Sequence, residues 1–181
     1  MEEKIITKGK TSTSQSWKCL NQLLSQDECE QILSDLPTPD YEAAPAINRF
    51  QVQVPLNTWY KMEKVPIRIE LIASEFITSK LAERLNKDFT VFDNRMYVTK
   101  YTENQYCAPH VDPSEYTAII QLNNEYSGGE FTLNNTPIEM SIGDALVFPN
   151  ANYLHGVKKI KQGTRSSLAL WLNYNKETYL H

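Results

Sequence analysis

A histidine and an aspartate stand two residues apart in "APHVDPSEYT", residues 108–117. Side chains two apart on an extended strand point to the same face, and Pro113 biases Asp112 toward extended geometry. His110 and Asp112 are therefore expected to project together, one with an imidazole nitrogen and the other with a carboxylate oxygen. These two groups make up two-thirds of a facial metal triad.

The third ligand is expected to be His155, in "FPNANYLHGV", because His181 at the end of the sequence is a weaker candidate. Two histidines and one carboxylate on one face of an octahedral ion leave three open sites, as in non-haem Fe(II) oxygenases. Zinc catalytic sites use the same ligand types, so the triad alone leaves the metal open. The alternative for an isolated HxD pair is a strand histidine hydrogen-bonded to a nearby carboxylate.

An arginine follows the last of these candidates in "HGVKKIKQGTRSSLALWL". Two antiparallel strands joined by the intervening turn would bring His155 and Arg165 close together. The period of two places on one face Arg165, Ser167, Ala169 and Trp171. A guanidinium that points into a barrel is costly unless an anion pairs with it, and its planar fork suits a carboxylate. The pattern predicts a dicarboxylate cosubstrate, chelated by the metal at one end and paired with Arg165 at the other.

The elements that position these residues change in character at about residue 90. Before it, Ser25 and Glu28 form a capping-box pattern, which predicts a short helix in "LLSQDECEQILSDL". "NRFQVQVP" alternates like a strand, and Pro66 is expected to open a longer helix over residues 66–89. The apolar stripe of this helix, expected to pack on a sheet, comprises Ile69, Ile72, Ala73, Phe76, Ile77, Leu81 and Leu85.

After residue 90, short strand-like runs alternate with turn-forming segments such as "SGG", "NNTP" and "KQGT". The runs are "RMYVTKY", "YTAIIQLN", "GEFTLN", "DALVFP" and "SSLALWLNY". This order predicts an α+β protein whose C-terminal half is a small β-sandwich or barrel. We expect a flexible arm over residues 1–16 and one domain over 17–181, with helical support over about 17–90 and a catalytic β-core over about 91–175.

Charge and composition argue against several classes of protein. The 18 basic and 22 acidic side chains give a net charge of −4 with no basic block, which disfavours nucleic acid as a partner. The 3 cysteines lack CxxC spacing and indicate reduced thiols. The first residues lack the apolar run of a secretory signal, and no stretch approaches the ~20 apolar residues of a membrane span. These features predict a cytoplasmic protein without a membrane partner.

From about Arg95 to Tyr174 the sequence resembles the 2-oxoglutarate and Fe(II)-dependent dioxygenases, and within them the prolyl 4-hydroxylase-like group. The matching pieces are "YTENQYCAPHVD", "LNNEYSGGEFTL", "IGDALVFPNANYLHGV" and "GTRSSLALWL". The resemblance implies a double-stranded β-helix of the jelly-roll or cupin-like type, with N-terminal supporting helices. It implies that the iron ligands are His110, Asp112 and His155. It also implies that Arg165 binds the distal carboxylate of 2-oxoglutarate.

Four further residues fall at cosubstrate-pocket positions of this group. Tyr101 matches a strand tyrosine that hydrogen-bonds 2-oxoglutarate, and Tyr97 shares its face of the strand. Gln121 replaces another cosubstrate-contacting tyrosine, and Trp171 matches a pocket-lining aromatic residue. The alternative for these side chains is a structural place in the core.

The resemblance implies hydroxylation of a C–H bond, most often in a prolyl residue of a peptide or protein. Fe(II), O2 and 2-oxoglutarate would be required, with ascorbate as an optional reductant, and 2-oxoglutarate would be converted to succinate and CO2. One alternative is hydroxylation of a free amino acid or another small metabolite. Another, from a different class, is a non-catalytic jelly-roll protein that binds a ligand. Asp112 disfavours a halogenase, because halide binding needs the carboxylate ligand replaced by a small residue.

Overall fold

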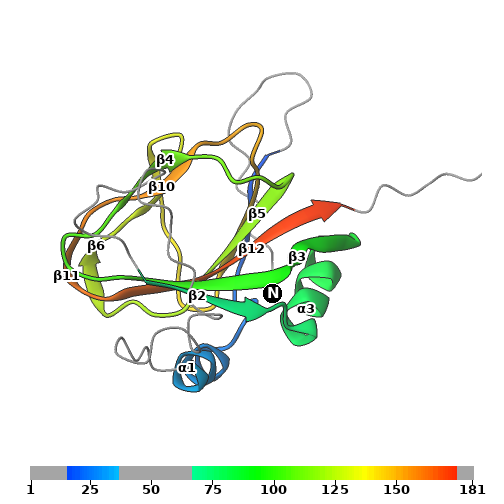
Figure 1. Cartoon of the computed structure of the whole chain (residues 1–181), viewed down its shortest axis with the longest axis horizontal. Coiled ribbons are helices and arrows are strands. Elements are labelled where there is room, and N and C mark those ends of the chain that lie inside the picture. Colours follow the sequence, from blue (N-terminus) through cyan, green and yellow to red (C-terminus); the bar gives the residue numbers. More distant parts are fainter. Residues whose placement is uncertain (1–15, 37–66, 175–181) are drawn as a thin grey trace, which may run out of the picture.

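The structure is a computed structural model that describes residues 16–36 and 67–174 (Figure 1). Its largest sheet has the strand order β1-β9-β5-β12-β3-β2. In that order, the strands are Lys18–Leu20, Ala145–Pro149, Tyr116–Gln121, Arg165–Tyr174, Phe89–Tyr101 and Ile67–Ile72. The second sheet has the order β4-β10-β7-β8. Its strands are Cys107–His110, His155–Val157, Phe131–Leu133 and Thr136–Ile138.

A small third sheet pairs β11 (Ile160–Gly163) with β6 (Tyr126–Gly128). The paired strands run antiparallel in each sheet. In Figure 1, α1 and α3 lie on one side of the largest sheet, and β4, β6, β10 and β11 lie on the other. The predicted α+β class and double-stranded β-helix are therefore confirmed.

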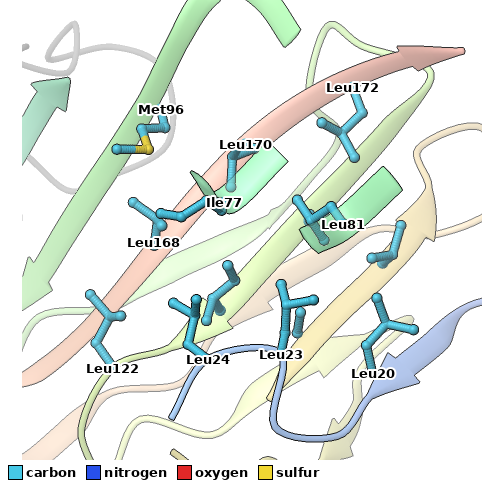
Figure 2. Close-up of a cluster of buried hydrophobic side chains, with 14 of the residues drawn as sticks. Leu20, Leu23, Leu24, Ile77, Leu81, Met96, Leu122, Leu168, Leu170 and Leu172 are labelled. Atoms are coloured by element: carbon cyan, nitrogen blue, oxygen red, sulfur yellow. The ribbon is translucent and has the colours of Figure 1, made fainter. Parts of the chain in front are cut away.

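The outer face of the largest sheet holds the main hydrophobic core. Leu168, Leu170 and Leu172 of β12 are fully buried there. They lie in one cluster with Ile77 and Leu81 of α3 (Glu75–Leu85), as Figure 2 shows. Burial of such aliphatic side chains contributes roughly 1.5–3 kcal/mol each. The helical layer thus holds the sheet from behind.

The inner face of the same sheet looks toward the second sheet and builds a separate core. Phe148 of β9 packs on Phe131 of β7, with ring centroids 5.9 Å apart. Trp17, Tyr101 and Ile160 belong to the same buried cluster. This core joins the two sheets and surrounds the predicted metal ligands.

The first predicted helix is confirmed, as α1 (Gln26–Asp35). The Ser25 hydroxyl accepts a hydrogen bond from the Glu28 backbone N–H at 3.1 Å, and the Glu28 carboxylate accepts one from the Ser25 N–H at 2.8 Å. This is the reciprocal pattern of a capping box. The predicted arm over residues 1–16 and the predicted strand "NRFQVQVP" fall wholly or almost wholly outside the described residues.

The prediction of one long helix from Pro66 is wrong. Residues 67–72 form strand β2, which pairs with β3, and only Glu75–Leu85 is helical. The segment "IRIELI" alternates apolar and polar residues over most of its length, and its β-branched isoleucines favour a strand where a partner is available. Ile72 and Phe76, predicted as core, are exposed by 72% and 52%.

The five strand-like runs predicted after residue 90 are confirmed as β3, β5, β7, β9 and β12. The 3 cysteines are free thiols, in agreement with the sequence. Within the described ranges, neither helix is long and apolar enough to cross a membrane.

Candidate metal centre and the cavity around it

The three predicted ligands lie together between the two sheets. His110 ends β4, Asp112 follows in the link to β5, and His155 begins β10. The nearer Asp112 carboxylate oxygens lie 3.4 Å from His110 Nε2 and 3.2 Å from His155 Nε2. The three ligand atoms lie within 4.8 Å of one another. This is the spacing of groups that bind one ion.

The pairing of β4 with β10 brings the two histidines together. His110 and His155 are direct partners in the ladder, and their ring centroids lie 4.2 Å apart. A Cβ on Gly156 would lie 2.7 Å from the Cys107 carbonyl oxygen. Glycine at this position therefore permits the close approach of β10 to β4.

His110 is held in one orientation by its own strand. Its Nδ1 lies 2.9 Å from the Ala108 carbonyl oxygen, which can only accept, so Nδ1 carries the proton. When the ring is neutral, as it is in a metal complex, Nε2 is then the nitrogen with a lone pair, and it faces Asp112. Cys107 Sγ also lies 3.3 Å from Nδ1. Hydrogen bonds of this kind set the tautomer of metal-binding histidines.

His155 is held by packing. Its ring lies 4.9 Å from the Phe148 ring and 5.9 Å from the Phe131 ring, measured between centroids. Its Nδ1 is buried without a hydrogen-bond partner. Burial lowers the pKa of His155, and a neutral imidazole is the form that binds a metal.

The neighbouring groups keep Asp112 ionised. Burial by itself raises the pKa of Asp112, but hydrogen bonds from His110, His155 and Thr117 hold it far below its usual range. For His110, burial lowers the pKa, but hydrogen bonds to Asp112 and Cys107 outweigh it and raise the pKa to about 10. A divalent ion would replace the proton that this buried pair shares. Two imidazoles and one carboxylate fit Fe(II), which the arrangement would hold with open sites remaining.

Arg165 lies in the wall of the same cavity as the triad. The side chain is 1% exposed. Nη1 donates to Ser167 Oγ at 3.1 Å, whereas Nε and Nη2 are buried without a partner. The Tyr101 and Phe131 ring centroids lie 6.0 and 5.9 Å from the guanidinium carbon. A buried cation with two unused donors calls for an anion, and a carboxylate matches its fork.

Arg165 and His155 are brought together by a route that differs from the predicted hairpin. β10 pairs with β4 and β7, whereas β12 pairs with β3 and β5. The two residues therefore lie on opposite sheets and face each other across the interior. The predicted hairpin between their strands is wrong, because β11 lies between β10 and β12 in the chain and pairs with β6.

The other predicted pocket residues occupy three places. Tyr101 lines the cavity of the triad, which has a volume of about 40 Å³. The Tyr97 ring lies 4.9 Å from the Trp171 ring, which in turn lies 5.9 Å from the Phe92 ring. Gln121 lines a larger hollow of about 920 Å³, where its Nε2 donates to the Tyr126 hydroxyl at 2.6 Å. Roles in cosubstrate binding remain predictions for all four.

Two residues at the site were missed in the sequence. Thr117 Oγ1 donates to Asp112 Oδ2 at 2.6 Å, and Asn150 Oδ1 accepts from the Asp112 N–H at 3.2 Å. Thr117 is close to Asp112 in the chain and lies in a recognised strand, so it could have been considered. Asn150 directly follows β9 and carries no local signal for this contact.

Comparison with known proteins supports the same reading of the β-core. Residues 96–173 match the family described as the 2OG-Fe(II) oxygenase superfamily. A PKHD-type hydroxylase from Prochlorococcus marinus (strain MIT 9515) is 29% identical over 116 residues, which cover 57% of this chain and 51% of that protein. The chain therefore spans about half the length of this curated relative.

Solved structures share the fold at low sequence identity. The viral collagen prolyl hydroxylase of Paramecium Bursaria Chlorella virus-1, in complex with 2OG, gives a TM-score of 0.59 at 15% identity, covering 87% of this chain and 95% of that one. A Pseudomonas putida prolyl-4-hydroxylase gives 0.58 at 15% identity, covering 87% and 91%. HygX of Streptomyces hygroscopicus, with nickel and 2-oxoglutarate bound, gives 0.59 at 16% identity, covering 87% and 82%. The predicted resemblance and the predicted Fe(II) and 2-oxoglutarate are confirmed by the family match and the triad.

Proposed function

We propose that this chain, whose residues 96–173 belong to the 2OG-Fe(II) oxygenase superfamily, is a dioxygenase that hydroxylates a prolyl residue in a peptide or protein. One observation carries the enzymatic part of the proposal. A guanidinium that is almost fully buried, with two unused nitrogens, lies in the wall of the cavity that holds the His–Asp–His triad. A non-catalytic binding protein has no need of this pair of features.

In the proposed reaction the main role of the protein is to bind Fe(II) and to orient 2-oxoglutarate beside it. His110, Asp112 and His155 would hold Fe(II), and Arg165 would bind the distal carboxylate of 2-oxoglutarate. When bound, Fe(II) with O2 and 2-oxoglutarate supplies the oxidising power: one oxygen atom enters the C–H bond, and 2-oxoglutarate becomes succinate and CO2. No side chain of this site is required as a general base.

The interior must adapt to the cosubstrate. A cavity of about 40 Å³ has room for roughly three water molecules, which is too little for a five-carbon diacid. Phe131 lines both this cavity and the hollow of about 920 Å³ beside it. We therefore expect the Phe131 side chain to move when 2-oxoglutarate binds.

The aromatic cluster Phe92, Tyr97 and Trp171 supports a prolyl substrate. Trp171 lies opposite Thr117 in the β12–β5 ladder, and Thr117 contacts Asp112, so the cluster stands close to the metal ligands. Phe92 is 41% exposed and gives the cluster a solvent-facing side. Proline-containing segments dock against aromatic surfaces at low entropic cost. The Prochlorococcus relative is named as a hydroxylase, which supports hydroxylation, and the Pseudomonas putida structure is that of a prolyl-4-hydroxylase, which supports the choice of a prolyl substrate.

The test is to incubate the protein with Fe(II), ascorbate and 2-oxoglutarate, together with a panel of proline-containing peptides. Succinate formation and a mass gain of one oxygen atom on a prolyl residue are expected. His110→Ala should abolish both, because the ion loses a ligand. A parallel panel of free amino acids tests the small-metabolite alternative.

The outcomes separate the competing functions. An oxygen atom added to a free amino acid and to none of the peptides would overturn the prolyl substrate and keep the enzyme class. Metal binding without any succinate formation would overturn the enzyme and favour the non-catalytic jelly-roll protein.

A further inference from the structure

Asp112 is held at several points by a buried hydrogen-bond network that the proposed reaction does not itself require. Thr117 Oγ1 donates to Asp112 Oδ2 at 2.6 Å. That distance is within the range of short, charge-assisted O–H···O⁻ bonds. Thr117 and Asp112 are both buried, so water does not compete for the bond. The Thr117 hydroxyl therefore occupies part of the lone-pair capacity of one carboxylate oxygen.

Asn150 determines the direction in which that hydroxyl points. Its Nδ2 donates to Thr117 Oγ1 at 3.0 Å and to the Ser114 carbonyl oxygen at 3.0 Å. The Thr117 hydroxyl accepts from Asn150 Nδ2, and its single proton is directed at Asp112 Oδ2 at 2.6 Å, because the other acceptor, Asn150 Oδ1, lies farther away at 3.4 Å. The other end of the amide, Oδ1, accepts from the Asp112 N–H at 3.2 Å. The reversed amide would set donor against donor at Asp112 and acceptor against acceptor at Ser114, so only this orientation satisfies the network.

The network also connects the two segments that carry the ligands. Asn150 follows β9 and stands on the link that leads to His155, whereas Thr117 and Asp112 flank the start of β5. The Asn150 N–H further donates to the Glu115 carbonyl oxygen at 2.9 Å. One amide side chain and its backbone thus fix the aspartate segment relative to the histidine segment.

We propose that Thr117, oriented by Asn150, is a positioning residue that keeps Asp112 a ligand through one oxygen only. A carboxylate that chelates through both oxygens takes two coordination positions, which would leave two open sites on an octahedral ion. Three open sites are needed for a chelating diacid and a second small molecule. This inference rests on the proposed function for its purpose, but its geometry is independent of the substrate.

The decisive comparison is Thr117→Val against Thr117→Ser, with Thr132→Val as the matched control. Thr132 is also a buried threonine, and its hydroxyl donates at 3.4 Å to the Gly156 carbonyl oxygen, away from the triad side chains. Each variant is titrated with Co(II) in the absence of O2. The Co(II)-loaded protein is then titrated with 2-oxoglutarate while its visible absorption, which reports coordination number, is recorded.

Loss of a side chain that hydrogen-bonds to a metal ligand weakens metal binding by about 10–100-fold. We expect Thr117→Val to lose Co(II) affinity by that factor, to bind 2-oxoglutarate more weakly and to show an altered absorption spectrum. Thr117→Ser and Thr132→Val should stay within about twofold of the wild type. Thermal unfolding of each metal-free variant is recorded beside the titration, and a loss of Co(II) affinity in a Thr117→Val protein that is folded at the temperature of the titration separates positioning from a general loss of stability.

Asn150→Asp tests the second link. The substitution keeps the shape and the acceptor for the Asp112 N–H but replaces the donor to Thr117 by a charged acceptor, which draws the hydroxyl proton away. Co(II) affinity is expected to fall as in Thr117→Val. Wild-type affinity in both Thr117→Val and Asn150→Asp would overturn the inference.

Different experimental results would overturn the proposed function and the positioning role of Thr117. A wild-type protein that binds Co(II) but whose Fe(II) form consumes no 2-oxoglutarate would overturn the proposed function, and the variant titrations would still decide the positioning role. A wild-type protein that binds no Co(II) would overturn both, since the triad would then not be a metal site.

Discussion

The two faces of strand β12 have different roles, since one face packs in the hydrophobic core and the other lines the cavity of the triad. On the outer face, Leu168, Leu170 and Leu172 are buried among apolar side chains beneath the helices. On the inner face, Arg165 and Ser167 lie in the cavity of the triad. The outer side chains are satisfied in the protein alone, whereas two nitrogens of Arg165 lack a partner. One strand thus contributes leucines to the core that stabilises the fold and a guanidinium that can bind an anionic ligand. The alternation of side chains along the strand places the two sets on opposite faces.

The largest expected effect is on the inner face. Replacement of Arg165 by Met should lower 2-oxoglutarate affinity by about 2–5 kcal/mol, the usual cost of losing one partner of a buried charge pair. Since the guanidinium is unpaired without cosubstrate, the free energy of unfolding should stay the same or rise. The dependence of succinate formation on the 2-oxoglutarate concentration reports the loss of affinity, and thermal unfolding reports the change in stability. The 2-oxoglutarate affinity of Arg165→Lys should lie between those of the wild type and Arg165→Met, because lysine keeps the positive charge but lacks the two parallel donors of the guanidinium. Unchanged cosubstrate affinity in Arg165→Met would contradict the division of faces.

The opposite pattern is expected for the outer face. Leu170→Ala should lower the free energy of unfolding by about 2–5 kcal/mol, because it leaves a cavity in a fully buried cluster. Co(II) affinity of the folded protein should not change. Ile72→Ala, at a side chain that is 72% exposed, is the control and should shift stability by less than about 0.5 kcal/mol. Chemical denaturation measures both. Equal losses in the two variants would show that Leu170 does not lie in a core.

A smaller effect is expected in the helical layer over the outer face. Ser25→Ala should cost about 1 kcal/mol of stability, because the Glu28 N–H loses its cap at the start of α1. Ser34→Ala is the control, since that hydroxyl only donates to the Glu30 carbonyl oxygen within the helix. Denaturant titration should rank Ser25→Ala below Ser34→Ala, and the reverse order would contradict the capping role.

The smallest effect concerns the charge of Glu28. Hydrogen bonds from the Ser25 N–H and Lys80 lower the pKa of Glu28 from its ordinary value of 4.5. Because its pKa is lowered, the ionised Glu28 side chain stabilises the folded state at every pH above the ordinary pKa of the group. This contribution is lost as the pH falls through the lowered pKa. Glu28→Gln should therefore cost less than about 1 kcal/mol at pH 7 and almost nothing in strong acid. Denaturation at both pH values measures this, with exposed Glu83→Gln as the control. A pH-independent difference would rule out the charge as its cause.

The assignment of side chains to the two faces of β12 is also the part of the fold that could be predicted from the sequence. The outer and inner sets of β12 follow from the alternation alone, and so does the joint projection of His110 and Asp112. The failure at residues 67–72 has a physical cause. Ile69 and Ile72 fit a helical spacing as well as Ile67, Ile69 and Leu71 fit a strand, and pairing with β3 decided between them.

The sequence by itself determined which side chains share a face, where α1 begins and which residue types were present for a metal and a diacid. These properties depend on the backbone geometry of a few neighbouring residues, which local sterics and hydrogen bonds govern. The tertiary structure alone decided that His155 pairs with His110 through β10 and β4, that Arg165 faces them from the other sheet, and that Asn150 binds the Asp112 segment. Such contacts join residues far apart in the chain, and they form only when the two sheets close upon each other.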